Sequence, residues 1–186
     1  VESLRAGMEK LVEDLNICSQ KGLAERFDAT IGSGTVCMPF GGKYQMTPSQ
    51  VMAAKIPVLD GETDTASLMA YGYDPELSSL SPYKGAMAAV IEAMSKLVAA
   101  GIDPKHAWLS FQEYFGRTGD NPEKWGKPFA ALLGALKAQA ELEVAAIGGK
   151  DSMSGTFEDI DVPPTLIAFA VSTAKASRIV TNEWKD

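Results

Sequence analysis

Residues 145–157 decide the organisation of the chain, and they read Ala145-Ala146-Ile147-Gly148-Gly149-Lys150-Asp151-Ser152-Met153-Ser154-Gly155-Thr156-Phe157. A short apolar run, strand-like in its length, breaks within a few residues into glycines, hydroxyls, a cation and a carboxylate. Such a glycine-rich polar sequence does not form a core. The stretch therefore predicts a strand that ends in a loop.

The composition of this loop suits a phosphate group. Glycine lets backbone N–H groups turn toward an anion, hydroxyls add hydrogen-bond donors, and lysine adds a positive charge. Asp151 could hold a magnesium ion or a ribose. The candidate binding residues are Gly149, Lys150, Asp151, Ser152 and Ser154.

The named phosphate and nucleophile motifs do not match the loop. A Walker loop needs Ser or Thr directly after its Gly-Lys and a glycine six residues before the lysine, where Asp151 and Val144 stand. Neither Ser152 nor Ser154 has the flanking glycines of a hydrolase nucleophile elbow. A plain turn between two strands remains an equally good interpretation of the residues alone.

Composition bounds the class of protein. With 186 residues, 46% of them apolar and 22% charged, the chain suits one soluble globular domain. A net charge of -7 argues against general binding of nucleic acid or an anionic membrane, so a phosphate must be held locally. There is no apolar run of membrane-spanning length and no signal-peptide pattern at the N-terminus, so we expect a cytoplasmic protein.

The cysteines and the histidine add no recognisable site. Cys18 and Cys37 lie in apolar settings without CxxC spacing, which indicates reduced, buried thiols. His106 is the only histidine, which excludes His-pair metal motifs. Its position after Pro104 predicts a surface or capping role.

The hydrophobic pattern alternates helices with short strands, which predicts an α+β protein with helices layered on a sheet. Helices are expected over 2–15, 20–27, 82–100 and from 122 or 127 to 142, with Ser81-Pro82 and Gly101 bounding the third. Strands are expected at 35–38, 56–59, 107–111 and 165–171, the last one central because it is almost wholly apolar. A turn is expected at 31–34 and an exposed polar insertion at 112–121.

Helical spacing also predicts which side chains are buried. The expected buried residues of the third helix are Tyr83, Met87, Val90, Met94 and Leu97. The expected buried residues of the last helix are Trp125, Phe129, Leu132, Leu133 and Leu136.

Two further polar features could join the loop. Asp60-Gly61-Glu62-Thr63-Asp64 is rich in the carboxylates that a hard divalent cation favours, although a solvated turn looks the same. On the third helix, Glu92 and Lys96 lie four residues apart on a face of alanines. They form either an ordinary surface ion pair or a metal or phosphate contact.

Taken in order, these segments resemble phosphoribosylformylglycinamidine synthase, the glutamine-dependent enzyme of purine synthesis. They resemble its second synthase domain, which is related to aminoimidazole ribonucleotide synthetase. Four stretches carry the resemblance over nearly the whole chain: residues 15–28, residues 57–61, residues 81–101, and Gly149-Lys150-Asp151-Ser152-Met153-Ser154.

The resemblance implies the α+β fold of the synthetase's N-terminal domain, also described as chorismate-mutase-like. That fold is a mixed sheet with helices packed on one face, here preceded by an N-terminal helical arm. The implied boundaries are an arm at 1–30, the synthase domain at 31–175, and the start of a linker to a further lobe at 176–186.

The resemblance also implies chemistry. In the family, ATP activates the amide oxygen of formylglycinamide ribonucleotide, and ammonia from glutamine displaces phosphate to give the amidine. Asp60 and Glu92 would bind Mg²⁺. The phosphates of ATP or ADP would meet Gly61, Lys96, Gly149, Lys150, Asp151, Ser152 and Ser154. This implication requires the three separated segments to converge on one hollow.

The sequence departs from the family at informative places. Gln20 stands where many relatives carry lysine, and Lys96 stands where the metal helix usually has asparagine. An ammonium cannot ligate magnesium, so Lys96 would meet phosphate directly, or the site would bind nucleotide only structurally. The family's catalytic His-Asn-His-Pro motif, a glutaminase nucleophile and a second lobe after Val171 are all missing from the sequence. We therefore expect an excised domain without turnover of its own, which works with the remaining domains of a parent synthase.

Two other interpretations remain. The chain could be a structural or auxiliary half of a pseudo-symmetric enzyme, with an exposed apolar sheet face that pairs with a counterpart or forms a homodimer. It could also be a kinase of the thiamine monophosphate or selenide type, against which the Gly-Lys-Asp-Ser-Met-Ser sequence argues.

Overall fold

A six-stranded mixed sheet forms the centre of the computed structural model, which describes residues 3–26, 29–30 and 34–183. The strand order is β1-β4-β5-β10-β6-β7, with β6 and β7 parallel and the other neighbours antiparallel. The strands are β1 (Thr35–Cys37), β4 (Met52–Lys55), β5 (Thr65–Gly72), β6 (Trp108–Tyr114), β7 (Ala146–Lys150) and β10 (Thr165–Lys175).

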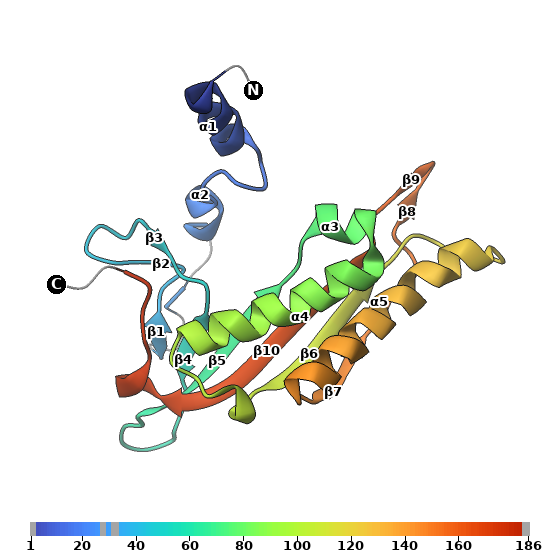
Figure 1. The fold of residues 1–186 in the computed structure, drawn as a ribbon. Coiled ribbons are helices and arrows are strands. Elements are labelled where there is room, and N and C mark those ends of the chain that lie inside the picture. The colour runs from blue at the N-terminus through green and yellow to red at the C-terminus, as the bar shows by residue number, and fades with distance from the viewer. Residues whose placement is uncertain (1–2, 27–28, 31–33, 184–186) are drawn as a thin grey trace.

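Two long helices, α4 (Pro82–Ala99) and α5 (Pro122–Leu142), lie side by side on one face of the sheet (Figure 1). Both begin at a capping side chain followed by proline. The Ser81 hydroxyl accepts from the Lys84 N–H, and the Asn121 side chain accepts from the N–H groups of Glu123 and Lys124. The predicted helices are confirmed, as are the Ser81-Pro82 start signal and the mixed α+β fold with helices on one face, whereas α3 (Pro75–Leu80) was not predicted.

The remaining elements are short and lie around this body. They are α1 (Leu4–Glu13), α2 (Lys21–Ala24), α3 (Pro75–Leu80), η2 (Pro104–His106), η3 (Ala176–Arg178), and the hairpins β2–β3 (Phe40–Gly41, Thr47–Pro48) and β8–β9 (Thr156–Phe157, Ile160–Asp161). Helix α1 has no buried residue and extends away from the sheet, as expected for an arm (Figure 1). No helix within the described ranges is both long and apolar enough to cross a membrane.

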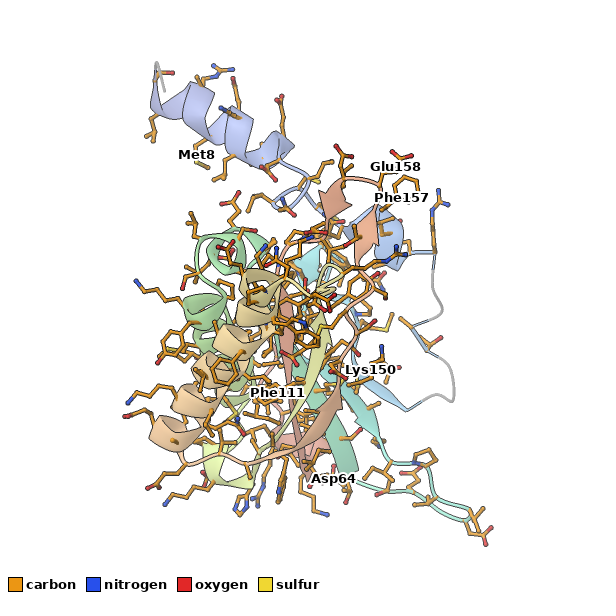
Figure 2. All side chains as sticks on the ribbon, turned by 90° about the vertical axis from the view of Figure 1, so that its right-hand side faces the viewer. Met8, Asp64, Phe111, Lys150, Phe157 and Glu158 are labelled. Atoms are coloured by element: carbon orange, nitrogen blue, oxygen red, sulfur yellow. The ribbon has the colours of Figure 1, made fainter. Side chains whose placement is uncertain are left out.

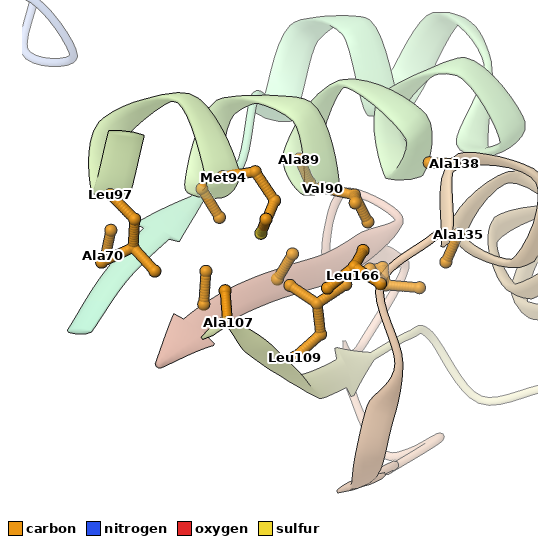
Figure 3. Close-up of a cluster of buried hydrophobic side chains, with 14 of the residues drawn as sticks. Ala70, Ala89, Val90, Met94, Leu97, Ala107, Leu109, Ala135, Ala138 and Leu166 are labelled. Atoms are coloured by element: carbon orange, nitrogen blue, oxygen red, sulfur yellow. The ribbon is translucent and has the colours of Figure 1, made fainter. Parts of the chain in front are cut away.

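Small residues bring the helix layer close to the sheet. The core combines Leu68, Leu109 and Leu166 from the strands with Val90, Leu97 and many alanines (Figure 3). A Cβ atom on Gly72 of β5 would lie 2.1 Å from the Ala89 carbonyl oxygen of α4. Glycine is therefore required where α4 contacts the sheet.

Central placement of β10 is confirmed, because β10 pairs with β5 on one side and with β6 on the other. Other strand predictions are wrong. Residues 56–59 are a loop, whereas β4 and β5 were not predicted, and Gln112–Tyr114 continue β6 instead of forming an insertion. The buried positions of β5 include only alanine, one leucine and glycine, which give a weak hydrophobic signal. Its ladder of hydrogen bonds to β10 decides the strand.

The predicted buried face of α5 is also wrong. Its five large apolar residues (Trp125, Phe129, Leu132, Leu133 and Leu136) are exposed, and the helix instead buries Pro128, Ala131, Gly134, Ala135 and Ala138. Close packing on α4 explains the reversal, because a Cβ on Gly134 would lie 2.0 Å from the Tyr83 carbonyl oxygen. On α4, burial of Val90, Met94 and Leu97 is confirmed, whereas Met87 is half-buried and Tyr83 is exposed.

The sheet face opposite the helices carries large apolar side chains. Cross-strand partners share a face, and here Tyr71 pairs with Phe169, and Met69 pairs with Val171, which pairs in turn with Trp108. Tyr71, Met69, Val171 and Trp108 are exposed. The predicted apolar sheet face is confirmed.

The remaining predictions concern the two cysteines, the histidine and two short segments near the N-terminus. Cys18 and Cys37 are reduced thiols that are only half-buried, and His106 is exposed at the end of η2. The end of the second helix at Phe27 and the turn at 31–33 lie outside the described residues.

Candidate functional site

The glycine-lysine loop begins at the edge of the sheet. Strand β7 is the last strand and runs parallel to β6, with Phe111 opposite Gly149 and Gln112 opposite Lys150. A Cβ on Gly149 would lie 2.5 Å from the Phe111 carbonyl oxygen, so glycine is needed there for strand pairing. Gly148 has φ +144°, a conformation that favours glycine. These glycines therefore have a structural reason to be present, whatever they bind.

Hydrogen bonds fix the loop against the end of β6. The Phe115 N–H donates to the Ser152 carbonyl oxygen at 2.9 Å, and the Gly155 N–H donates to the Phe115 carbonyl oxygen at 2.8 Å. The hydroxyls of Ser152 and Ser154 lie 2.8 Å apart and form a hydrogen bond. Lys150 and Asp151 remain exposed. The loop thus presents a cation, a carboxylate and two hydroxyls from an ordered backbone.

Glu92 and Lys96 lie at the same end of the sheet, over β5. Glu92 Oε2 accepts from the Tyr73 N–H at 3.1 Å, and its Oε1 lies 2.7 Å from Lys96 Nζ. Lys96 Nζ also donates to the Tyr71 carbonyl oxygen at 2.8 Å and lies 4.5 Å from the centre of the Tyr71 ring. Both charged groups therefore have partners within the protein, and the Lys96 side chain is only 15% exposed.

The sheet register measures how far Glu92 is from the loop. Gly72, Ala168, Phe111 and Gly149 form one row across β5, β10, β6 and β7. Three strand spacings separate the two ends of this row, so Gly72 and Gly149 lie about 14 Å apart. Glu92 contacts the β5 end of the row, since a Cβ on Gly72 would lie 2.9 Å from its Cβ. Glu92 and Lys150 therefore lie at one end of the sheet but over different strands.

Asp60 and Gly61 lie at the opposite end. They belong to the exposed turn between β4 and β5, before Thr65, which pairs with Lys175. Seven residues of β5 separate Thr65 from the row of Gly72, or about 23 Å. Figure 2 shows Asp64, near the end of this turn, well away from Lys150. Asp64 itself accepts from the Ser177 N–H and hydroxyl, and these bonds lower its pKa.

The structure therefore corrects the predicted convergence. It leaves Asp60 far from both Glu92 and Lys150, so Asp60 and Glu92 do not fit one magnesium ion, whose ligands lie about 2.0–2.1 Å from the metal. Within the described residues, no three His, Cys, Asp or Glu side chains form a group that could hold a metal. The role of each of these residues as an individual ligand stays a prediction.

A residue that the sequence reasoning missed lies beside the loop. Glu113 is 6% exposed, and its Oε1 atom is buried without a hydrogen-bond partner. Burial, followed by the charge of Asp151, raises the pKa of Glu113 to about 7 from an ordinary 4.5. The signal was available, because Leu109, Phe111 and Glu113 alternate along β6 and Phe115 follows directly after it, so that a carboxylate interrupts an otherwise apolar face.

Glu113 lines a hollow of about 280 Å³ between the sheet and α5. Glu113 and Asp151 directly follow the paired residues Gln112 and Lys150, so their side chains are neighbours across the two strands. Apolar and backbone groups form the other walls. The lining residues are Phe111, Glu113, Leu132, Ala146, Gly148, Gly149, Lys150 and Asp151.

The fold of this chain is similar to that of solved PurL structures. No family model matches the chain. Among solved structures, the PurLQS complex of Thermotoga maritima gives a TM-score of 0.69 at 18% identity, over 88% of this chain and 25% of that one. PurL of T. maritima complexed with ADP gives a TM-score of 0.68 at 17% identity, over 89% of this chain and 25% of that one.

The curated relatives that match the chain include PurL subunits of phosphoribosylformylglycinamidine synthase. The phosphoribosylformylglycinamidine synthase subunit PurL of Rhodopseudomonas palustris is 27% identical over 158 residues, covering 85% of this chain and 19% of the relative. PurL of Methanocaldococcus jannaschii is 25% identical over 206 residues, covering 100% of this chain and 26% of the relative. The resemblance predicted from the sequence is confirmed, and the chain spans about a fifth to a quarter of these relatives.

Proposed function

We propose that this chain is the nucleotide-binding part of a phosphoribosylformylglycinamidine synthase, with the phosphates held at the Gly149–Ser154 loop. The observation that carries the proposal is the fixed backbone of this loop, which presents Lys150 and the paired hydroxyls of Ser152 and Ser154 at a strand end. Lysine and hydroxyl groups bind phosphate oxygens in a fixed geometry when the backbone beneath them is ordered.

Relatives support the same role. T. maritima PurL has been solved with ADP, with ATP and with FGAR. The parent reaction would convert formylglycinamide ribonucleotide, ATP, glutamine and water into the amidine, ADP, phosphate and glutamate. Such chemistry depends on positioning phosphate and neutralising its charge, which is the contribution that Lys150 would make. No step is assigned to magnesium, because Asp60 and Glu92 do not meet.

Calorimetric titration with ADP tests the proposal, with and without Mg²⁺. We expect Lys150→Ala to weaken ADP binding about tenfold, the usual effect of losing one charge-assisted contact. Lys105→Ala is the matched control, because Lys105 is an exposed lysine in η2, away from the loop. Equal affinity in the wild type and Lys150→Ala would reject the loop as the phosphate site. We expect no amidine formation by the chain alone.

The alternative function is a structural half of the synthase core. Two observations favour it: Glu92 and Lys96 already satisfy each other, and the sheet carries an exposed apolar face. A synthase partner domain, or a second copy of the chain, would cover Tyr71, Trp108 and Val171. If this alternative holds, Trp108→Glu disrupts self-association in sedimentation experiments, whereas ADP produces no heat in any variant.

A further inference from the structure

The hollow beside Glu113 holds a carboxylate that has no ion-pair partner among the described residues. Glu113 Oε1 is buried and unpartnered, and Asp151 places a second carboxylate at the same end. Lys150 also lines the hollow, but no ion pair joins it to either carboxylate among the described residues. An unpartnered buried carboxyl group is costly, and a ligand that donates a hydrogen bond to it removes that cost.

The walls restrict the kind of ligand. Phe111, Leu132 and Ala146 supply apolar surface, and the volume of about 280 Å³ is close to that of sites for small organic molecules. A bare metal ion would leave the apolar walls without contact. It would also find too few ligands, because no group of three metal-binding side chains exists in the described residues.

We propose that this hollow binds a small organic cation, a primary ammonium group attached to a short hydrocarbon body. The ammonium donates to Glu113 Oε1 and interacts with Asp151, and the hydrocarbon packs against Phe111, Leu132 and Ala146. Three donors on an ammonium match two carboxylates and leave one for a backbone carbonyl oxygen of the glycine strand. The proposal does not depend on nucleotide binding, because it uses no phosphate contact.

Calorimetry and thermal unfolding at pH 8, in a buffer free of primary amines, test the site with n-butylammonium as the probe. n-Butanol is the matched neutral compound, and Mg²⁺ is tested separately. We expect n-butylammonium to bind and to raise the melting temperature, and n-butanol to have little effect. Glu113→Gln should weaken the binding roughly tenfold, and Asp151→Asn should weaken it less.

Glu62→Gln, in the distant exposed turn, is the control and should bind like the wild type. Glu113→Gln keeps the shape of the side chain and removes a buried charge, so it should fold. The proposal is overturned if the wild type and Glu113→Gln respond equally to n-butylammonium, or if n-butanol binds as well as the cation. It is also overturned if Mg²⁺ alone gives a response that depends on Glu113.

Discussion

Two carboxylates at the same end of the sheet show opposite solutions to the same problem. Glu92, on the part of α4 that covers β5, accepts from the Tyr73 N–H and pairs with Lys96. Beside it, α4 packs closely against Gly72 of β5. Glu113, on β6, is more deeply buried but has an unpartnered oxygen beside an open hollow. The comparison teaches that a charged residue in a region of predicted function is more informative when its partners are missing than when they are present.

Gly72→Ala, beside Glu92, should cause the largest change in stability. The new Cβ would lie 2.1 Å from the Ala89 carbonyl oxygen, so α4 must move away from β5. We expect destabilisation of about 3 kcal/mol, measured by urea unfolding. Gly126→Ala is the control, because a Cβ added there would have no atom within 4 Å and alanine favours the helix. A stable Gly72→Ala protein with unchanged unfolding would contradict the tight contact.

Glu92→Ala should give the next largest effect. It removes the acceptor of the Tyr73 N–H and the partner of a mostly buried Lys96. We expect a loss of about 1–2 kcal/mol, since Glu92 itself is partly exposed to solvent. Glu141→Ala removes a comparable helix ion pair with Lys137 that is exposed, so it should change stability much less. Similar losses in both variants would mean that Glu92 is only a surface residue.

Glu113→Gln should increase the free energy of unfolding, in contrast to the two preceding variants. The folded-state pKa of Glu113, about 7, lies above its ordinary value of 4.5, so the folded protein holds this proton more tightly than the unfolded chain. The stabilising contribution is therefore complete below pH 4.5 and is lost as the pH rises through 7. Relative to the wild type, Glu113→Gln should gain about 1 kcal/mol between pH 5 and pH 8 in urea unfolding. If the free energies of unfolding of the two proteins change with pH in parallel, the charged form of Glu113 is not buried.

Asp60→Asn should give the smallest effect. Asp60 lies in an exposed turn at the far end of the sheet, apart from both carboxylates of the comparison. We expect ADP affinity and unfolding to match the wild type. A loss of Mg²⁺-dependent ADP binding in this variant alone would restore Asp60 to the nucleotide site.

The sequence predicted the helices well because their signals are local. Ser81-Pro82 and Asn121-Pro122 specify the starts of α4 and α5 through hydrogen bonds within a few residues. The nearly continuous apolar run after Thr165 likewise predicted the central strand. The Gly-Lys-Asp-Ser loop was chosen from residue types alone; it lies at the end of β7, and its role in binding stays a prediction.

Only the tertiary structure decided which residues meet. Asp60, Glu92 and Lys150 were expected in one hollow, but strand order places β10 and β6 between β5 and β7, and strand direction sends Asp60 to the other end. Burial on α5 was likewise decided by close contact at Gly134, which favours small residues over Trp125 and Phe129. Helix caps and strand hydrophobicity act between neighbours in sequence, whereas pairing register and backbone contact distance act between segments far apart, and the sequence does not display them.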